Sequence, residues 1–138
     1  FLQAAGFGWL TPFVVSAAGR RTKTRGHSTA DAGAVFPQSV ASGDPSPTGV
    51  VLWTRVDPAA WSAETPLRFE IATDDGFRRI KLAGEVAPQD FAAARDFTVH
   101  LDLDGHLDAG RIYFYRFLHG STASRTGRCR TLPRAGAS

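Results

Sequence analysis

The sequence predicts an all-β fold, an antiparallel β-sandwich. About six or seven short segments rich in β-branched and aromatic residues follow one another at roughly even spacing. Turn-forming Gly, Pro, Asp and Ser residues separate these segments. Short strands at such spacing close into two packed sheets, so one sandwich is expected from about Phe36 to Leu132.

The first two strands are expected on either side of a tight corner between Phe36 and Val56. Residues 42–49 are dense in Gly and Pro, and Asp44 is expected to cap its own turn rather than act as a catalytic carboxylate. Residues 50–56 have the β-branched and aromatic composition of a buried strand. This composition places Trp53 in the core.

The middle of the chain alternates between apolar and polar residues, as half-buried strands do. Leu67–Ile71 directs Phe69 and its two apolar neighbours to one face, and Phe97–Leu103 alternates in the same way. Between them, residues 77–85 read as a shorter or edge strand. Residues 88–95 are ambiguous, because three consecutive alanines could form one helical turn.

The strand expected at Arg111–Leu118 is apolar on both faces. If Tyr113 and Tyr115 face the core, the alternate residues face outward, and a strand of this kind is normally covered on both sides. The cover is either another domain or a loop of this one. The residues expected at an interdomain interface are Arg55, Ile112, Phe114, Arg116 and Leu118.

The net charge of +3 and the pI near 9.6 do not extend to the expected sandwich. Four of the sixteen basic residues lie between Arg20 and Arg25, and from Phe36 onward twelve basic residues balance twelve acidic ones. A domain without net charge has no field that attracts a phosphate backbone. Nucleic-acid binding is therefore not expected.

The N-terminal region reads as an export signal followed by a linker. Residues 1–18 contain a short apolar core and end in small residues, as in a signal peptide, although an N-terminal core helix is the alternative. Phe1-Leu2-Gln3 resembles the tail of a twin-arginine motif. Residues 19–35 are polar and aperiodic, which predicts a flexible linker. We expect a periplasmic or extracellular location, reached through the export machinery.

No residue is expected to be catalytic or to bind a metal. Residues 102–108 superficially resemble a calcium-binding loop, but strands flank them, so outward carboxylates and a turn are expected. His100 and His106 are expected in solvent, and His119 at a strand end has no second ligand nearby in the sequence. Cys129 is the sole cysteine and should behave as a small apolar residue.

One stretch carries a family resemblance. FPQSVASGDPSPTGVVLWTRVDP, residues 36–58, resembles the opening signature of the PhoD-like secreted alkaline phosphatases and phosphodiesterases. The resemblance extends to about Pro133 and covers that family's N-terminal accessory domain. It implies a domain at residues 36–133, and a linker from residue 134 toward a metallophosphatase domain that this chain lacks.

The resemblance also implies a function. The chain would be inactive alone, and its partner would be its own catalytic domain, whose iron and calcium ligands would lie outside this chain. The oligomeric state is left open. The alternatives are a stand-alone fibronectin-like binding module, or the N-terminal domain of a purple-acid-type phosphatase, which also carries such a sandwich.

A second resemblance concerns a corner of the fold. Residues 107–113, LDAGRIY, resemble the corner before the sixth strand of fibronectin type III domains. In that corner the tyrosine hydroxyl bonds to backbone near the leucine, which here would join Tyr113 to the region of Leu107. Trp53, followed by Pro58, also resembles that family. The sandwich is therefore expected to be fibronectin type III-like or immunoglobulin-like, with a core around Trp53, Tyr113, Phe69 and Tyr115.

Overall fold

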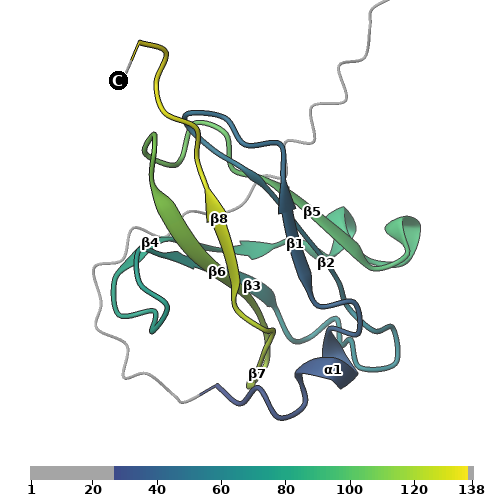
Figure 1. The fold of residues 1–138 in the computed structure, drawn as a ribbon. Coiled ribbons are helices and arrows are strands. Elements are labelled where there is room, and N and C mark those ends of the chain that lie inside the picture. Colours follow the sequence, from purple (N-terminus) through teal and green to yellow (C-terminus); the bar gives the residue numbers. More distant parts are fainter. Residues whose placement is uncertain (1–26, 137–138) are drawn as a thin grey trace, which may run out of the picture.

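The computed structural model describes residues 27–136 as two antiparallel β-sheets packed face to face (Figure 1). The predicted β-sandwich is therefore confirmed, while the predicted signal peptide lies outside the described residues. The strands are β1 (Val40–Gly43), β2 (Val51–Arg55), β3 (Leu67–Ala72), β4 (Ile80–Val86), β5 (Thr98–Asp102), β6 (Ile112–His119), β7 (Thr122–Ala123) and β8 (Gly127–Arg130).

One sheet has three strands in the order β1-β2-β5, and the other has five. In the larger sheet β4, β3 and β6 are neighbours, and β7 and β8 both pair with the remaining side of β6. β7 lies at the His119 end of β6 and β8 at its Ile112 end. The last two strands therefore act as one interrupted edge strand.

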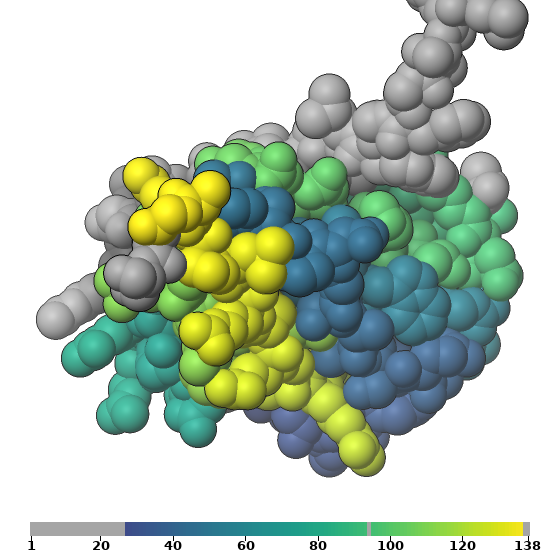
Figure 2. Space-filling view, turned by 45° about the horizontal axis from the view of Figure 1, so that its top comes forward, coloured from purple at the N-terminus to yellow at the C-terminus, as the bar shows by residue number. Residues whose placement is uncertain are grey.

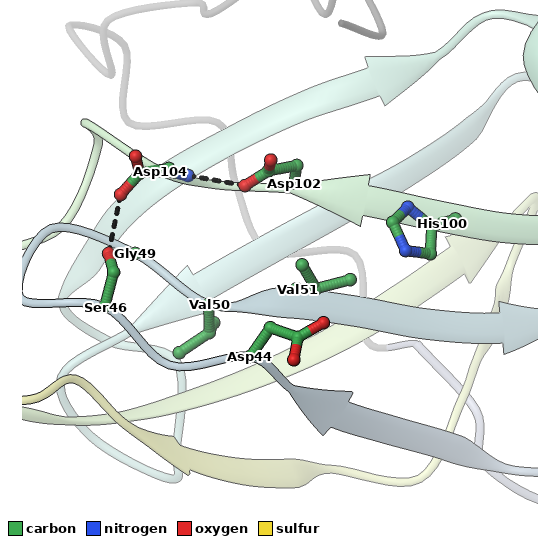
Figure 3. Close-up of a pocket in the computed structure, with 8 residues that line it drawn as sticks. All are labelled: Asp44, Ser46, Gly49, Val50, Val51, His100, Asp102 and Asp104. Carbon is green, nitrogen blue, oxygen red and sulfur yellow. Dashed lines mark hydrogen bonds between the residues drawn. The ribbon is translucent and has the colours of Figure 1, made fainter. Parts of the chain in front are cut away.

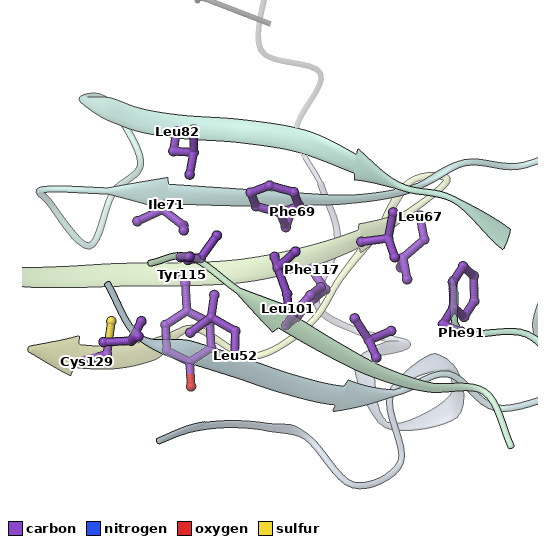
Figure 4. Packing of buried hydrophobic residues seen from close by; sticks show 14 of the residues in the cluster. Leu52, Leu67, Phe69, Ile71, Leu82, Phe91, Leu101, Tyr115, Phe117 and Cys129 are labelled. Carbon is purple, nitrogen blue, oxygen red and sulfur yellow. The ribbon is translucent and has the colours of Figure 1, made fainter. Parts of the chain in front are cut away.

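The inner faces of the two sheets form the hydrophobic core (Figure 4). Phe69, Tyr113 and Tyr115 are buried in it, as predicted. Leu52 and Leu101 reach it from the smaller sheet and are fully buried. Because burying one large apolar side chain contributes about 1.5–3 kcal/mol, this shared layer is the main source of cohesion between the sheets.

The prediction that Trp53 lies in the core is wrong. In β2 the side chains of Leu52 and Thr54 point inward and are fully buried, so Trp53 lies on the outer face and is partly exposed. Thr54 can occupy the interior because its hydroxyl donates a 2.6 Å hydrogen bond to the Ser39 carbonyl. Successive side chains of a strand alternate between faces, so burying Thr54 turns Trp53 outward.

The corner at residues 107–113 forms the tyrosine bond that the motif implied. The Asp108 backbone N–H donates to the Tyr113 hydroxyl at 3.0 Å. The Asp108 carboxylate in turn accepts a 2.8 Å hydrogen bond from the Lys81 ammonium on β4. The corner is therefore joined both to the core and to the edge of the larger sheet.

The predicted linker at residues 19–35 is wrong over its described part, residues 27–35. A short helix α1 (Ala32–Val35) forms there and buries Ala32 and Val35. Ser28 pairs with Thr122 of β7, and the Val35 carbonyl accepts the Asp57 N–H at 2.8 Å. Local pattern does not predict this packing, because residues 27–35 contain few apolar residues and their partners lie far along the chain. No helix in residues 27–136 has the length and apolarity to cross a membrane.

The segments between the strands agree in outline with what the sequence predicts. The ambiguous residues 88–95 form two 3₁₀ turns, η1 (Pro88–Asp90) and η2 (Ala93–Arg95). The predicted edge strand is β4, and the turn before it is held by the Asp74 carboxylate, which accepts backbone N–H groups of Arg78 and Arg79.

Candidate functional site

A hollow of about 360 Å³ on the outer side of the smaller sheet gathers four of the ionisable residues that the sequence singled out (Figure 3). Asp44 borders it from the corner after β1, and His100 and Asp102 border it from β5. Asp104 closes it from the loop that follows β5. All four side chains are exposed to solvent.

Asp104 holds the corner between β1 and β2 against the end of β5. Its carboxylate oxygen Oδ1 accepts hydrogen bonds of 2.6 Å from both the Ser46 and the Thr48 hydroxyl groups. These two bonds lower the pKa of Asp104 below its ordinary value, and the bond from Ser46 has the larger effect. Gly49 is needed at this contact, since a Cβ there would lie 2.5 Å from the Asp104 nitrogen.

The carboxylates of the hollow do not fit a metal centre. Oδ1 of Asp104 is already engaged by two hydroxyl groups, and Oδ1 of Asp102 accepts the Asp104 N–H at 2.9 Å. Within residues 27–136 no three His, Cys, Asp or Glu side chains are placed to share an ion. The iron and calcium implied by the family resemblance therefore find no ligand set in the described part of the chain. What this arrangement does chemically is to fasten two loops.

The histidines differ in environment. His100 and His106 are exposed, whereas His119 is buried at the end of β6. Its Nε2 accepts the Ser62 N–H at 3.3 Å, and burial lowers the pKa of His119 below its ordinary value. The imidazole is therefore neutral and supports the long loop between β2 and β3. His27 is half-buried, and burial lowers its pKa as well.

Cys129 lies on the inner side of β8 and is buried. Burial raises the pKa of its thiol to about 11. A thiol of that pKa is protonated near neutral pH and is a poor nucleophile. This environment fits the predicted role of a small apolar residue.

The five residues expected at an interdomain interface do not share one surface. Arg55 is on β2 of the smaller sheet, and it pairs with Asp96 at 3.2 Å. Ile112, Phe114 and Arg116 are on β6 of the larger sheet. The outer faces of the two packed sheets point in opposite directions, so Arg55 cannot extend a surface centred on β6.

Two further members of that set are already engaged within this domain. Leu118 is 1% exposed, close to the place where Ser28 joins β7, so part of the outer face is covered by the domain itself. Arg116 pairs with Glu70 at 2.7 Å, and its guanidinium lies 4.1 Å from the centroid of the Phe77 ring. The alternative of a cover from this same domain is therefore correct at Leu118. Ile112 and Phe114 remain at the surface.

Three surface residues of this region were not in the predicted set. Arg128 and Arg130 point outward from β8, and Leu132 beyond them is 46% exposed. The signal was present in the sequence, because residues 127–130 alternate small or apolar with cationic side chains. The alternation alone does not show which residues lie beside these arginines. The pairing of β6 with β8 places Arg128 opposite Phe114 and Arg130 opposite Ile112.

Comparisons with known proteins agree on one family. Residues 20–133 match the family model of the PhoD-like phosphatase N-terminal domain. Alkaline phosphatase D of Bacillus subtilis is 38% identical over 109 residues, which are 74% of this chain and 18% of that protein. A solved structure of PhoD is 34% identical with a TM-score of 0.60, over 74% of this chain and 20% of that one.

The chain thus spans about a fifth of the length of the relatives that it matches. The match starts at residue 20, ahead of the predicted boundary at residue 36, which agrees with the packing of residues 27–35 onto the sandwich. This chain belongs to the family of PhoD-like phosphatase N-terminal domains.

Proposed function

We propose that this chain is the non-catalytic N-terminal accessory domain of an exported, metal-dependent alkaline phosphatase or phosphodiesterase. The observation that carries the proposal is the family match over residues 20–133, together with relatives about five times longer. The catalytic iron and calcium would be bound by the part of the protein that follows. The protein would act in the periplasm or outside the cell.

The state of the ionisable groups supports a structural role. Asp104 accepts two hydroxyl hydrogen bonds, His119 accepts a backbone N–H, and the pKa of Cys129 is about 11. Each of these groups is used to hold the fold rather than being free to react with a substrate. A rigid sandwich of this kind would support the metallophosphatase domain and shape the approach to its cleft.

A direct assay tests this role. The 138-residue chain is incubated with a chromogenic phosphate monoester and a diester, with Fe³⁺ and Ca²⁺ added, beside the full-length protein. We expect turnover only by the full-length protein, and a lower melting temperature when residues 27–133 are deleted from it. Hydrolysis by the 138-residue chain alone would refute the proposal, as would a deletion that leaves stability and activity unchanged.

A further inference from the structure

The two large apolar residues that are exposed in the described part of the chain lie together. Ile112 is 39% exposed and Leu132 is 46% exposed. Ile112 is paired with Arg130, and the Gly110 N–H bonds the Leu132 carbonyl at 2.9 Å, so Leu132 lies one step further along the same edge. Phe114 and Arg128 form the adjacent pair. We call Ile112, Phe114, Arg128, Arg130 and Leu132 the β6–β8 patch.

The charge of this patch is uncompensated within the domain. Arg55, Arg78 and Arg116 each have a carboxylate partner within 3.5 Å. Within residues 27–136, neither Arg128 nor Arg130 has such a partner, and both are exposed. Arginines beside exposed aromatic and aliphatic side chains are typical of protein interfaces. The surface that complements this patch would be apolar at its centre and would carry carboxylates.

The chain leaves the domain beside this patch. The Leu132 N–H bonds the Ser46 carbonyl at 3.0 Å, and the Thr131 N–H bonds the Arg111 carbonyl at 3.0 Å. The Thr131 hydroxyl also donates to the Asp108 carbonyl at 2.6 Å. The backbone is therefore held in place up to Leu132. Figure 2 shows this C-terminal segment, in yellow, at the surface next to the blue segment that contains β1.

A polypeptide that continues from this point starts next to the patch. Both relatives are about five times longer than the matched region. A short tether keeps the two parts at an effective concentration on the order of millimolar, so even a modest surface would remain docked. Proximity therefore favours the following part of the same protein over a separate partner as the occupant of the patch.

We infer that the β6–β8 patch is the docking surface for the part of the protein that follows Gly136, and that this part presents carboxylates to Arg128 and Arg130. The inference rests on the proposed function and adds which face is used. Trp53 lies on the outer face of the other sheet, pointing the opposite way, and stays uncovered.

The test uses hydroxyl-radical footprinting of the full-length protein, which labels Ile, Leu, Phe and Trp side chains. We expect Ile112 and Leu132 to be labelled several-fold less in the full-length protein than in the 138-residue chain, whose fold is checked by circular dichroism. Trp53 should be labelled equally in both. The double variant Arg128→Glu and Arg130→Glu of the full-length protein should restore the labelling of Ile112 and Leu132.

The matched control is the double variant Arg79→Glu and Arg125→Glu, which changes the net charge equally at exposed positions that are not part of the patch. It should leave the labelling unchanged. Leu132→Asp gives a second variant at a position too exposed to unfold the domain, and it should act like the β8 double variant. Protection of other residues with Ile112 and Leu132 fully labelled would overturn this inference and leave the proposed function standing. No protection anywhere on the domain would overturn both.

Discussion

The backbone of Gly127 lies directly against the buried ring of Tyr115, its partner across β6 and β8. A Cβ at residue 127 would overlap the ring and lie 2.6 Å from the phenolic oxygen. An aromatic ring that covers a glycine on the neighbouring strand is a known way to fix strand register at a sheet edge. This contact places β8, and with it Arg128 and Arg130, in register with β6.

Replacing Gly127→Ala should therefore destabilise the domain. Because the Tyr115 ring is buried in the core, the added methyl group overpacks this contact, and we expect a loss of about 3 kcal/mol in the free energy of unfolding, at the upper end for overpacking. Urea denaturation followed by tryptophan fluorescence measures it. Gly43→Ala is the matched control, because a Cβ at that strand position meets nothing within 4 Å. Equal stabilities of the two variants would contradict the prediction.

Tyr113→Phe should cost about 1 kcal/mol of unfolding free energy, because it removes the acceptor of the Asp108 N–H and keeps the ring. The loss should appear as a lower urea midpoint with an unchanged slope. Tyr115→Phe provides a comparison at the other buried tyrosine, which lacks this corner contact. A Tyr113→Phe variant as stable as the parent would show that the corner does not depend on the hydroxyl.

Stability should decrease on mild acidification because of His119. Burial holds its folded-state pKa below the ordinary value of 6.5, so the unfolded chain binds more protons below that pH. The contribution of His119 to the stability is complete above pH 6.5 and is lost as the pH falls toward its folded-state pKa. His119→Gln, which keeps an acceptor for the Ser62 N–H, should flatten this part of the curve.

Melting temperatures between about pH 7.5 and 5 measure this dependence. His27, whose pKa is also lowered by burial, contributes in the same direction and is separated by His27→Gln. A pH dependence that survives both the His119 and His27 replacements would contradict the assignment.

Cys129 should limit stability in alkali. Its folded-state pKa of about 11 exceeds the ordinary value of 9.0, so the unfolded chain loses this proton first as the pH rises. The contribution of Cys129 to the stability is complete below pH 9. It falls between about pH 9 and 11, by on the order of 2 to 3 kcal/mol. Cys129→Ala should flatten this decline, measured by denaturation at several pH values. Tyr113 and Tyr115, whose pKa values burial also raises, leave a residual slope at higher pH.

The strands that alternate cleanly were predictable from the sequence. In β3 and β5 every second residue is apolar and the residues between are mostly polar. The inward direction of the Phe69 and Leu101 side chains therefore follows from the local pattern alone. In β2 both alternating sets of side chains include large apolar residues. Which set points inward depends on the Ser39 carbonyl, which accepts the hydrogen bond of the Thr54 hydroxyl. That bond joins Thr54 of β2 to the residue before β1, fifteen residues earlier in the chain, and no local pattern reveals it.

The outer face of β6 could be predicted only in part, for the same reason. Leu118 pairs with Ala123 of β7, and β7 is joined by Ser28, which pairs with Thr122 more than ninety residues later in the chain. The partner of Arg116 is Glu70, forty-six residues away, which only the register of β3 and β6 brings opposite. Contacts of this range follow from the topology of the sheet and not from any one segment.

The interrupted edge of β6 determines where the polypeptide enters and leaves the domain. Ser28 joins the edge at β7, beside His119, and Leu132 leaves it beside Gly110 at the opposite end. The eight residues of β6 at about 3.3 Å each correspond to roughly 26 Å. The domain is consequently a spacer of fixed length, which keeps Ser28 about one strand length away from Leu132.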